Sequence, residues 1–125
     1  MDEKKKVLIV DDEQAFNRVM RERLTMDGYD AISAYDGAQG IQFARQQQPD
    51  LIILDINLPA GRGDAIYKRL KEFEYTSHIP IIIITALPVE EIEKKLYELG
   101  VEKDNMFYKP VDFDTLAERI GALLT

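Results

Sequence analysis

The sequence LIILD at residues 51–55 decides the fold, because four apolar residues run without interruption into a carboxylate. A continuous apolar run of this length is typical of a strand that is covered on both faces. Val7 to Val10 and Ile81 to Ile84 have the same character. These three segments are therefore predicted to form the central strands of a parallel sheet.

Segments of helical period alternate with the apolar runs along the chain. Ala31 to Tyr35 and Met106 to Tyr108 are shorter and more mixed, which favours strands nearer the sheet edges. Five helical patterns have their apolar residues at Phe16, Val19, Met20 and Leu24; at Ile41 and Ala44; at Ile66, Leu70 and Phe73; at Ile92, Leu96 and Leu99; and at Leu116, Ile120, Leu123 and Leu124. Five strands in strict alternation with five helices predict one α/β domain with a doubly wound parallel sheet, since parallel strands require crossover connections.

The ends of the predicted helices carry suitable residues. Gly28 and Gly100 stand where helices should end, because glycine adopts the left-handed backbone of a helix C-terminus without strain. Pro88 is predicted at a first helical position, and Asp112 is predicted to cap the last helix.

Length and charge narrow the classes of function. At 125 residues the chain makes one domain of ordinary size, so we expect it to act alone or through partners rather than through an attached DNA-binding domain. The formal net charge of −7 argues against binding to nucleic acid or to a membrane surface, since both attract basic proteins.

The absence of cysteine excludes disulfides, zinc–thiolate sites and thiol nucleophiles. The charged amino terminus lacks a signal-type apolar segment, which predicts a cytoplasmic protein.

Polar residues follow four of the predicted strands at the point where each strand ends. Asp11 and Asp12 follow the first strand, Asp55 the third, Thr85 the fourth and Lys109 the fifth. The carboxyl ends of parallel strands meet at one edge of the sheet, which is where such folds bind ligands. This set suits a divalent cation and a phosphoryl group, because hard oxygen ligands hold Mg²⁺ while an ammonium and a hydroxyl meet phosphoryl oxygens.

Each of these residues also has a purely structural explanation. Asp11 and Asp12, together with Glu13, could be negative charge that the positive end of the following helix stabilises, and Thr85 alone could be an ordinary strand residue. Lys109 could belong to an ordinary turn. Asp55 is different, because a carboxylate at the end of a central strand and beside other acids carries an electrostatic cost that calls for a cation or a function. Their joint occurrence at strand ends therefore favours a site.

Together these segments resemble the receiver domains of bacterial two-component response regulators, the chemotaxis CheY-like family, over essentially the whole chain. The matching residues are Asp11-Asp12, Asp55 with Leu58-Pro59 and Gly63, Thr85-Ala86, and Lys109-Pro110. The resemblance implies the strand order 2-1-3-4-5 and a single receiver domain over residues 1–125, with no output domain. It also implies that Asp55 accepts a phosphoryl group from a histidine kinase or a phosphotransfer protein. Such a domain is a switch that assists its own phosphorylation and dephosphorylation, rather than an enzyme.

The resemblance also assigns the metal site around the phosphoacceptor. Asp12 and Asp55 would coordinate Mg²⁺ through their carboxylates, and Asn57 through its backbone carbonyl. Asp11 would hold a water molecule that is bound to the metal. Mn²⁺ is an alternative cofactor for the same oxygen ligands.

Three further residues would act on the phosphoryl group. Lys109 would neutralise its oxygens, and Thr85 would hydrogen-bond one of them and so draw the fourth strand toward the site. The small Ala86 would leave room for the group. In this family the peptide bond before Pro110 is usually cis.

This chain departs from the family on its output side. Met106 stands where most members carry an aromatic residue that turns inward on activation. Tyr108 is predicted on the same strand face as Met106 and is a candidate substitute. The segment before Lys109 is longer than usual, with an insertion around residues 101–104. We therefore expect intact phosphorylation chemistry with altered coupling to a downstream protein target. That target would bind the face formed by the fourth helix, fifth strand and fifth helix, in a monomer or a phosphorylation-dependent dimer.

Two positions near the site are candidate modulators. Arg62 stands where many receivers have an acidic or amide residue. A solvated side chain is its simpler interpretation, and partner recognition or added positive charge near the phosphoryl group is the alternative. Asn57 and Leu87 occupy positions that in this family tune how water reaches the phospho-aspartate. Leu87 offers no hydrogen bond to an attacking water, so we expect slow self-dephosphorylation.

Two other classes of function remain open. A phosphorylation-independent interaction module would keep the fold without the phosphorylation cycle, and the intact acids, threonine and lysine speak against it. An enzyme or cofactor binder on the same architecture is the other class. A flavodoxin would need a Ser/Thr/Gly-rich phosphate loop where this chain has residues 11–14. A haloacid-dehalogenase-type phosphatase would need an acid in place of Asn57.

Overall fold

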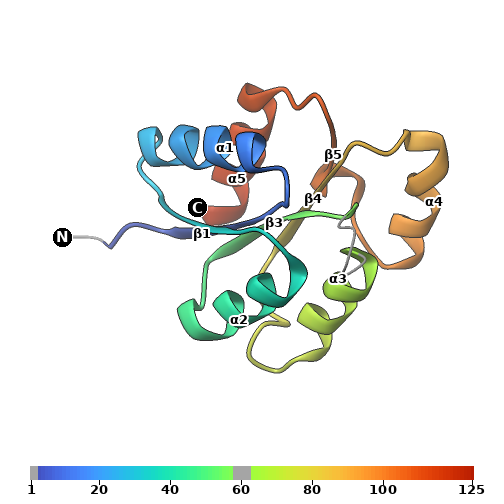
Figure 1. Cartoon of the computed structure of the whole chain (residues 1–125), viewed down its shortest axis with the longest axis horizontal. Helices are drawn as coiled ribbons and strands as arrows, with labels where there is room; N and C mark the ends of the chain where they lie inside the picture. Colours follow the sequence, from blue (N-terminus) through green and yellow to red (C-terminus); the bar gives the residue numbers. More distant parts are fainter. Residues whose placement is uncertain (1–2, 58–62) are drawn as a thin grey trace.

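The computed structural model describes residues 3–57 and 63–125 and has three layers, with one sheet between two layers of helices (Figure 1). The strands are β1 (Lys6–Val10), β2 (Asp30–Ala34), β3 (Leu51–Asp55), β4 (Ile81–Thr85) and β5 (Met106–Tyr108). The helices are α1 (Gln14–Met26), α2 (Gly37–Gln47), α3 (Gly63–Glu72), α4 (Val89–Glu98), α5 (Phe113–Leu124) and the short 3₁₀ helix η1 (Lys103–Asn105). Within the two described ranges, no helix combines the length and the apolar character that crossing a bilayer requires.

The strand pairs of the sheet are all parallel, in the order β2-β1-β3-β4-β5. This order and the doubly wound α/β class are confirmed. Each predicted strand agrees with the structure to within one residue at either end. β3 and β4 are buried along their whole length, which explains why their sequences are continuously apolar instead of alternating.

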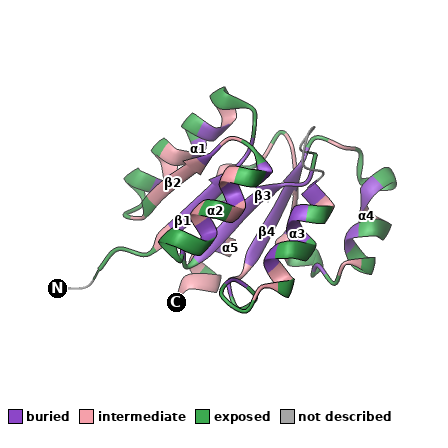
Figure 2. Cartoon of the chain, turned by 60° about the horizontal axis from the view of Figure 1, so that its bottom comes forward, coloured by how far each residue is buried: buried purple, intermediate pink, exposed green. Residues whose placement is uncertain are grey.

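Successive side chains of the central strands enter two separate apolar layers, which appear as the buried inner sides of the helices in Figure 2. The layer under α2, α3 and α4 includes Leu8, Ile52, Ile83, Leu70 and Leu96. The layer under α1 and α5 includes Ile9, Ile53, Ile82, Met20 and Leu116. The helices therefore bury both faces of the sheet and leave its carboxyl edge for polar residues.

The helix ends agree with the predictions at three of four positions. Gly28 and Gly100 have φ angles of +94° and +88°, in the left-handed region that glycine tolerates best. The Asp112 carboxylate accepts hydrogen bonds from two backbone N–H groups in the first turn of α5. The prediction for Pro88 was wrong by one position, because this residue lies at the N-cap, directly before α4.

The buried side of α1 differs from the predicted one. Val19 was expected to face the core, yet 46% of its surface is exposed. The buried residues of this helix are Asn17, Met20 and Leu24. A polar residue thus occupies one position of the buried stripe, and the helix is turned so that Val19 points outward.

The side chains of β5 alternate as predicted, with Met106 and Tyr108 on one face of the sheet and Phe107 on the other. Met106 is buried, and the Tyr108 hydroxyl lies 4.0 Å from its sulfur. In the sheet register Tyr108 is paired with Thr85 of β4. Tyr108 is therefore the direct neighbour of the residue that ends β4.

The longer segment before β5 forms an ordered structure. Its residues 103–105 make η1. Arg119 of α5 donates a 2.7 Å hydrogen bond to the Asn105 side chain and lies 4.0 Å from the Glu102 carboxylate. The segment is thereby attached to α5.

We predict that Gly40→Ala destabilises the protein. A Cβ atom at Gly40 of α2 would lie 2.9 Å and 3.0 Å from the two methyl groups of Val10, which is fully buried in β1. Overpacking of this kind outweighs the gain in helix propensity, so we expect a loss of about 1 kcal/mol in the free energy of unfolding. Gly121→Ala in α5 is the matched control, because nothing lies within 4 Å of a Cβ there. Urea titrations should show it to be as stable as the wild type or more so, and equal effects of the two substitutions would contradict the prediction.

Candidate functional site

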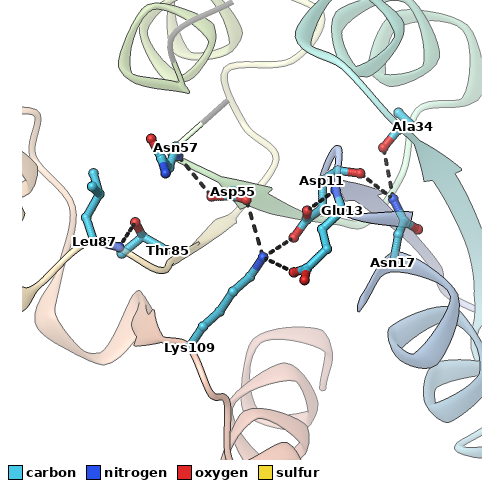
Figure 3. Close-up of polar contacts among 9 residues, drawn as sticks. All are labelled: Asp11, Glu13, Asn17, Ala34, Asp55, Asn57, Thr85, Leu87 and Lys109. Carbon is cyan, nitrogen blue, oxygen red and sulfur yellow. Dashed lines mark hydrogen bonds and ion pairs between the residues drawn. The ribbon is translucent and has the colours of Figure 1, made fainter. Parts of the chain in front are cut away.

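The carboxyl ends of β1, β3, β4 and β5 meet at one edge of the sheet (Figure 3). Asp11 and Asp12 follow β1 directly, and Asp55 is the last residue of β3. One carboxylate oxygen from each of these residues lies within 4.8 Å of the other two. Asp11 and Asp55 are buried, whereas Asp12 is exposed. The structure therefore brings the three acids into one cluster that borders on solvent at Asp12.

Lys109, which follows β5, enters this cluster with its ammonium group (Figure 3). Its Nζ donates to Asp11 Oδ2 at 2.9 Å and to Glu13 Oε1 at 3.0 Å, and it lies 3.4 Å from Asp55 Oδ2. The three N–H donors of one ammonium thus serve three carboxylates. The centroid of the Phe16 ring lies 4.3 Å from the same nitrogen, which adds a cation–π contact.

The backbone of Lys109 is also held in place. Its N–H donates a 2.8 Å hydrogen bond to the carbonyl oxygen of Thr85, so the end of β5 is joined to the end of β4. The following peptide bond, to Pro110, is cis, as the resemblance implied. The lysine therefore approaches the acids from a fixed position at the neighbouring strand end.

Burial and charge act in opposite directions on the titrating groups of the site. Burial raises the pKa of Asp11 to about 6, although hydrogen bonds from Lys109 and from the Glu13 N–H oppose this effect. Burial lowers the pKa of Lys109, but its hydrogen bonds to Asp11 and Glu13 outweigh burial and bring that pKa above the usual value of a lysine. The lysine is therefore fully charged near neutral pH, while the ionised form of Asp11 is disfavoured.

This balance of charge fits a hard cation. In the described part of the chain, the carboxylates of Asp11, Glu13 and Asp55 pair with a single ammonium, that of Lys109, and Asp12 adds a fourth carboxylate to the cluster. An additional positive charge would offset the remaining repulsion, and carboxylate oxygens are the ligands that Mg²⁺ and Ca²⁺ prefer. The cluster formed by Asp11, Asp12 and Asp55 can therefore hold a metal ion.

Thr85 and its loop lie on the other side of Asp55 from Asp11 (Figure 3). Thr85 is buried, and its hydroxyl oxygen accepts a 3.0 Å hydrogen bond from the Leu87 N–H. Because this bond uses only the oxygen, the hydroxyl proton is still available to a ligand. Ala86 is exposed between them, and Leu87 packs half-buried against the core layer under α4.

The segment after β3 approaches the site closely. The Asn57 N–H donates a 2.9 Å hydrogen bond to Asp55 Oδ1, and the Asn57 residue is exposed. A Cβ atom at Gly63 would collide with the backbone of Ile56, so a glycine is needed where α3 begins. The predicted positions Leu58, Pro59 and Arg62 lie outside the described residues.

Asn17 is a residue of the site that the sequence analysis missed. Its side-chain amide donates 3.0 Å hydrogen bonds to the backbone carbonyls of Asp11 and Ala34, and its oxygen accepts a 2.6 Å bond from the Ser33 hydroxyl. Asn17 therefore fixes the end of β1 against the end of β2. The available signal was a polar residue at the spacing of the apolar stripe of α1.

Glu13 and Phe16 were interpreted only as a charge at a helix start and as a core residue. Both contact the Lys109 ammonium. Their role depends on how closely the start of α1 lies to the end of β5, and no local pattern in the sequence gives that distance.

Fold and site together define a class of protein, a doubly wound α/β domain with an acidic cation site and a lysine at the carboxyl edge of its sheet. The chain belongs to the response regulator receiver domain family, which it matches over residues 7–121. The predicted family is thus confirmed. Receiver domains are the phosphoacceptor switches of two-component signal transduction, and they interact with histidine kinases and downstream targets.

Several relatives support this assignment. The chain is 38% identical to the DNA-binding dual master transcriptional regulator RpaA of Synechocystis over 119 residues, which cover 95% of this chain and 48% of RpaA. It is 32% identical to the polar-differentiation response regulator DivK of Brucella ovis over 120 residues, which cover 96% of each protein. The structure of chemotaxis protein CheY4 from Vibrio cholerae superposes with a TM-score of 0.87 at 25% identity, over 98% of this chain and 100% of CheY4. RpaA and the ycf27 regulators are longer proteins, and the chain spans about half of their length.

We predict that Asp11 makes the metal-free protein less stable as pH rises. Its pKa is about 6 in the folded protein, against 3.8 for an aspartate in an unfolded chain, so the folded state binds more protons between these values. The free energy of unfolding therefore loses a contribution of about 3 kcal/mol as pH rises through this window. Asp11→Asn should lack that loss. In urea titrations with EDTA between about pH 4 and pH 7, the free energy of unfolding of the variant should therefore rise relative to that of the wild type up to about pH 6. A difference that stays constant over this range would contradict the prediction.

Proposed function

We propose that Asp55 is the phosphoacceptor of this receiver domain. The observation that carries the proposal is the different engagement of the two buried acids. Both oxygens of Asp11 are held, by the Glu13 N–H and by Lys109 at 2.9 Å. Asp55 has one oxygen held by the Asn57 N–H, while the other accepts only a longer hydrogen bond, of 3.4 Å, from Lys109. That second oxygen is therefore the better placed nucleophile.

The transfer would be an in-line displacement on a phosphohistidine of the donor protein. An Asp55 oxygen forms the new P–O bond as the P–N bond breaks and the imidazole leaves. The Asn57 N–H keeps the carboxylate oriented, and Lys109 neutralises charge on the transferred oxygens in a loose transition state. Asp12, Asp55, Asp11 and the Asn57 carbonyl would hold Mg²⁺ or Mn²⁺, which supplies further charge stabilisation. The domain would assist its own phosphorylation and dephosphorylation without acting as an enzyme on other substrates.

The phosphoryl group would then act on β4. The Thr85 hydroxyl can donate its proton to a phosphoryl oxygen, and Ala86 beside it leaves space. Tyr108 is the register neighbour of Thr85, and burial together with nearby Glu93 of α4 raises the pKa of its phenol. This position between β4 and α4 supports Tyr108, rather than the buried Met106, as the residue that passes a shift of Thr85 to the α4–β5–α5 face.

The partners follow from these roles. A histidine kinase or a phosphotransfer protein would supply the phosphoryl group in the cytoplasm, and a downstream protein would bind the α4–β5–α5 face. Val89 and Tyr97 are exposed on α4 beside Glu90, Glu93, Glu98 and Lys94. Acidic residues outnumber the one basic residue there, which suits a partner with basic and apolar residues. The acidic net charge of −7 argues against direct contact with nucleic acid or a membrane. Residues 1–125 would form one receiver unit, either monomeric or dimerising on phosphorylation.

Intact mass spectrometry after incubation with acetyl phosphate and Mg²⁺ tests the phosphoacceptor. We expect the wild-type chain to gain one phosphoryl group and Asp55→Asn to gain none, because the amide lacks the nucleophilic oxygen anion. Asp104→Asn, which changes an exposed acid of η1, is the matched control and should behave as the wild type. EDTA should abolish the adduct.

Either of two outcomes would contradict this proposal. An adduct on Asp55→Asn equal to that on the wild type would place the phosphoryl group elsewhere. No adduct on the wild type, from acetyl phosphate or from a phosphorylated phosphotransfer protein, would favour a phosphorylation-independent interaction module.

We also predict a long-lived phosphoryl group. Leu87 is half-buried, and its apolar side chain offers an attacking water no hydrogen bond. Leu87→Asn should therefore shorten the lifetime of the adduct by about fivefold, the effect of one hydrogen bond of about 1 kcal/mol. Leu87→Ala, which adds no polar group, should leave the lifetime within about twofold of the wild type. A wild-type lifetime shorter than that of Leu87→Asn would refute the prediction.

A further inference from the structure

A groove of about 640 Å³ lies between α2 and α3, away from the acidic cluster. Figure 2 shows these two helices side by side on the face of the sheet that they cover. Ile41, Gln42 and Arg45 of α2 line one wall, and Arg69 of α3 lines the other. Tyr75, from the segment between α3 and β4, also lines the groove and is 67% exposed. The groove thus combines an apolar residue, two guanidinium groups and an exposed phenol.

The charge of this groove is opposite to that of the protein. The chain has a net charge of −7, yet the only charged residue within α2 is Arg45. Among the residues that line the groove in the described part of the chain, both charged side chains are arginines. A positive strip is therefore present on an otherwise acidic molecule, and it attracts anionic groups selectively.

The two arginines are available to a partner. In the described ranges neither Arg45 nor Arg69 forms an ion pair, whereas Arg23, Lys95 and Lys109 do. The Arg69 guanidinium lies 5.4 Å from the centroid of the Phe73 ring, and this contact keeps it at the groove without using its N–H donors. Arginine presents these donors in a planar fork that matches a carboxylate.

The composition is that of a protein-binding surface. Arginine and tyrosine are enriched at the energetic centres of protein interfaces, and lysine and acidic residues are depleted there. The groove is also open to solvent, so a segment of a partner protein can reach the residues that line it. Tyr75 and Ile41 offer contact to an apolar or aromatic side chain between the acidic ones.

We propose that the α2–α3 groove binds an acidic segment of a partner protein, with carboxylates on Arg45 and Arg69 and an aromatic or apolar side chain against Tyr75. This surface differs from the α4–β5–α5 face in position and in charge. It would let the domain hold an acidic partner and a basic one at the same time.

The test is an NMR titration of the isotopically labelled, unphosphorylated chain with the capped peptide EEWEE. Binding is measured from the changes in amide chemical shifts. The readout is independent of phosphorylation, so its result does not depend on whether Asp55 is the phosphoacceptor. We expect saturable binding with a Kd of about 1 mM or tighter at low salt, and shift changes that centre on α2, α3 and Tyr75. Raising NaCl from about 50 mM to about 300 mM should weaken binding severalfold. The peptide KKWKK should not bind there, and EEGEE should bind more weakly.

Matched variants separate the groove from general charge. Arg45→Glu and Arg69→Glu should each weaken EEWEE binding by at least about fivefold. Arg18→Glu, at an exposed position of α1, makes the same charge change elsewhere and should have less than about a twofold effect. Tyr75→Ala should weaken binding, whereas Tyr97→Ala, which removes a 47% exposed tyrosine of α4, should not. Amide spectra of each variant verify that it is folded.

Four outcomes would overturn the proposal. The first is no saturation by EEWEE, and the second is shift changes centred on another face. The third is an equal loss of binding from Arg18→Glu and Arg45→Glu, which would indicate a general charge effect. The fourth is tighter binding of another occupant to the same arginines. A single-stranded oligothymidylate would make the groove a nucleic-acid site, and self-association that Arg45→Glu abolishes would make it a contact between copies of this chain.

Discussion

The ion pair between Lys109 and Asp11 is the interaction on which the site depends. It joins residues 98 positions apart in the sequence, and it spans the sheet edge from the end of β5 to the end of β1. Asp11 is fully buried, so without this partner its charge would be strongly disfavoured. In the sheet β3 and β4, which are buried along their whole length, lie between β1 and β5 and hold these two strands in register. The geometry of the charged site at the sheet edge therefore depends on the packing of the apolar layers.

Much of this arrangement could be predicted from the chain itself. Continuous apolar runs at β1, β3 and β4 indicated central strands, and Gly28, Gly100 and Asp112 marked helix ends, because these signals are local and depend on one residue type at one position. The acids that converge at the sheet edge could be predicted as well, since every parallel strand ends there. Contacts between helices and strand ends could not be predicted from the sequence. Glu13 and Phe16 reach Lys109 because the start of α1 lies close to the residue that follows β5, and Asn17 takes a buried position of α1 where its amide bonds to strand ends.

The surface divides into regions of different charge despite the acidic composition. α4 presents three glutamates and one lysine, Lys94, around Val89 and Tyr97, whereas the wall of α2 carries Arg45 among uncharged residues. Both helices cover the same face of the sheet, with α3 between them, and they bury their apolar sides in one continuous core layer. Substitutions on their outer sides can therefore change the charge of either region without altering the packing that supports the site.

The hydrogen bond from the Lys109 N–H to the Thr85 carbonyl joins the two residues that would contact the phosphoryl group under the proposed function. At 2.8 Å it is a full backbone bond, and the cis bond to Pro110 follows it directly. The Thr85 hydroxyl and the Lys109 ammonium thus belong to two neighbouring strand ends that this hydrogen bond joins. A ligand that moved the end of β4 would therefore also act, through this one hydrogen bond, on the backbone of Lys109.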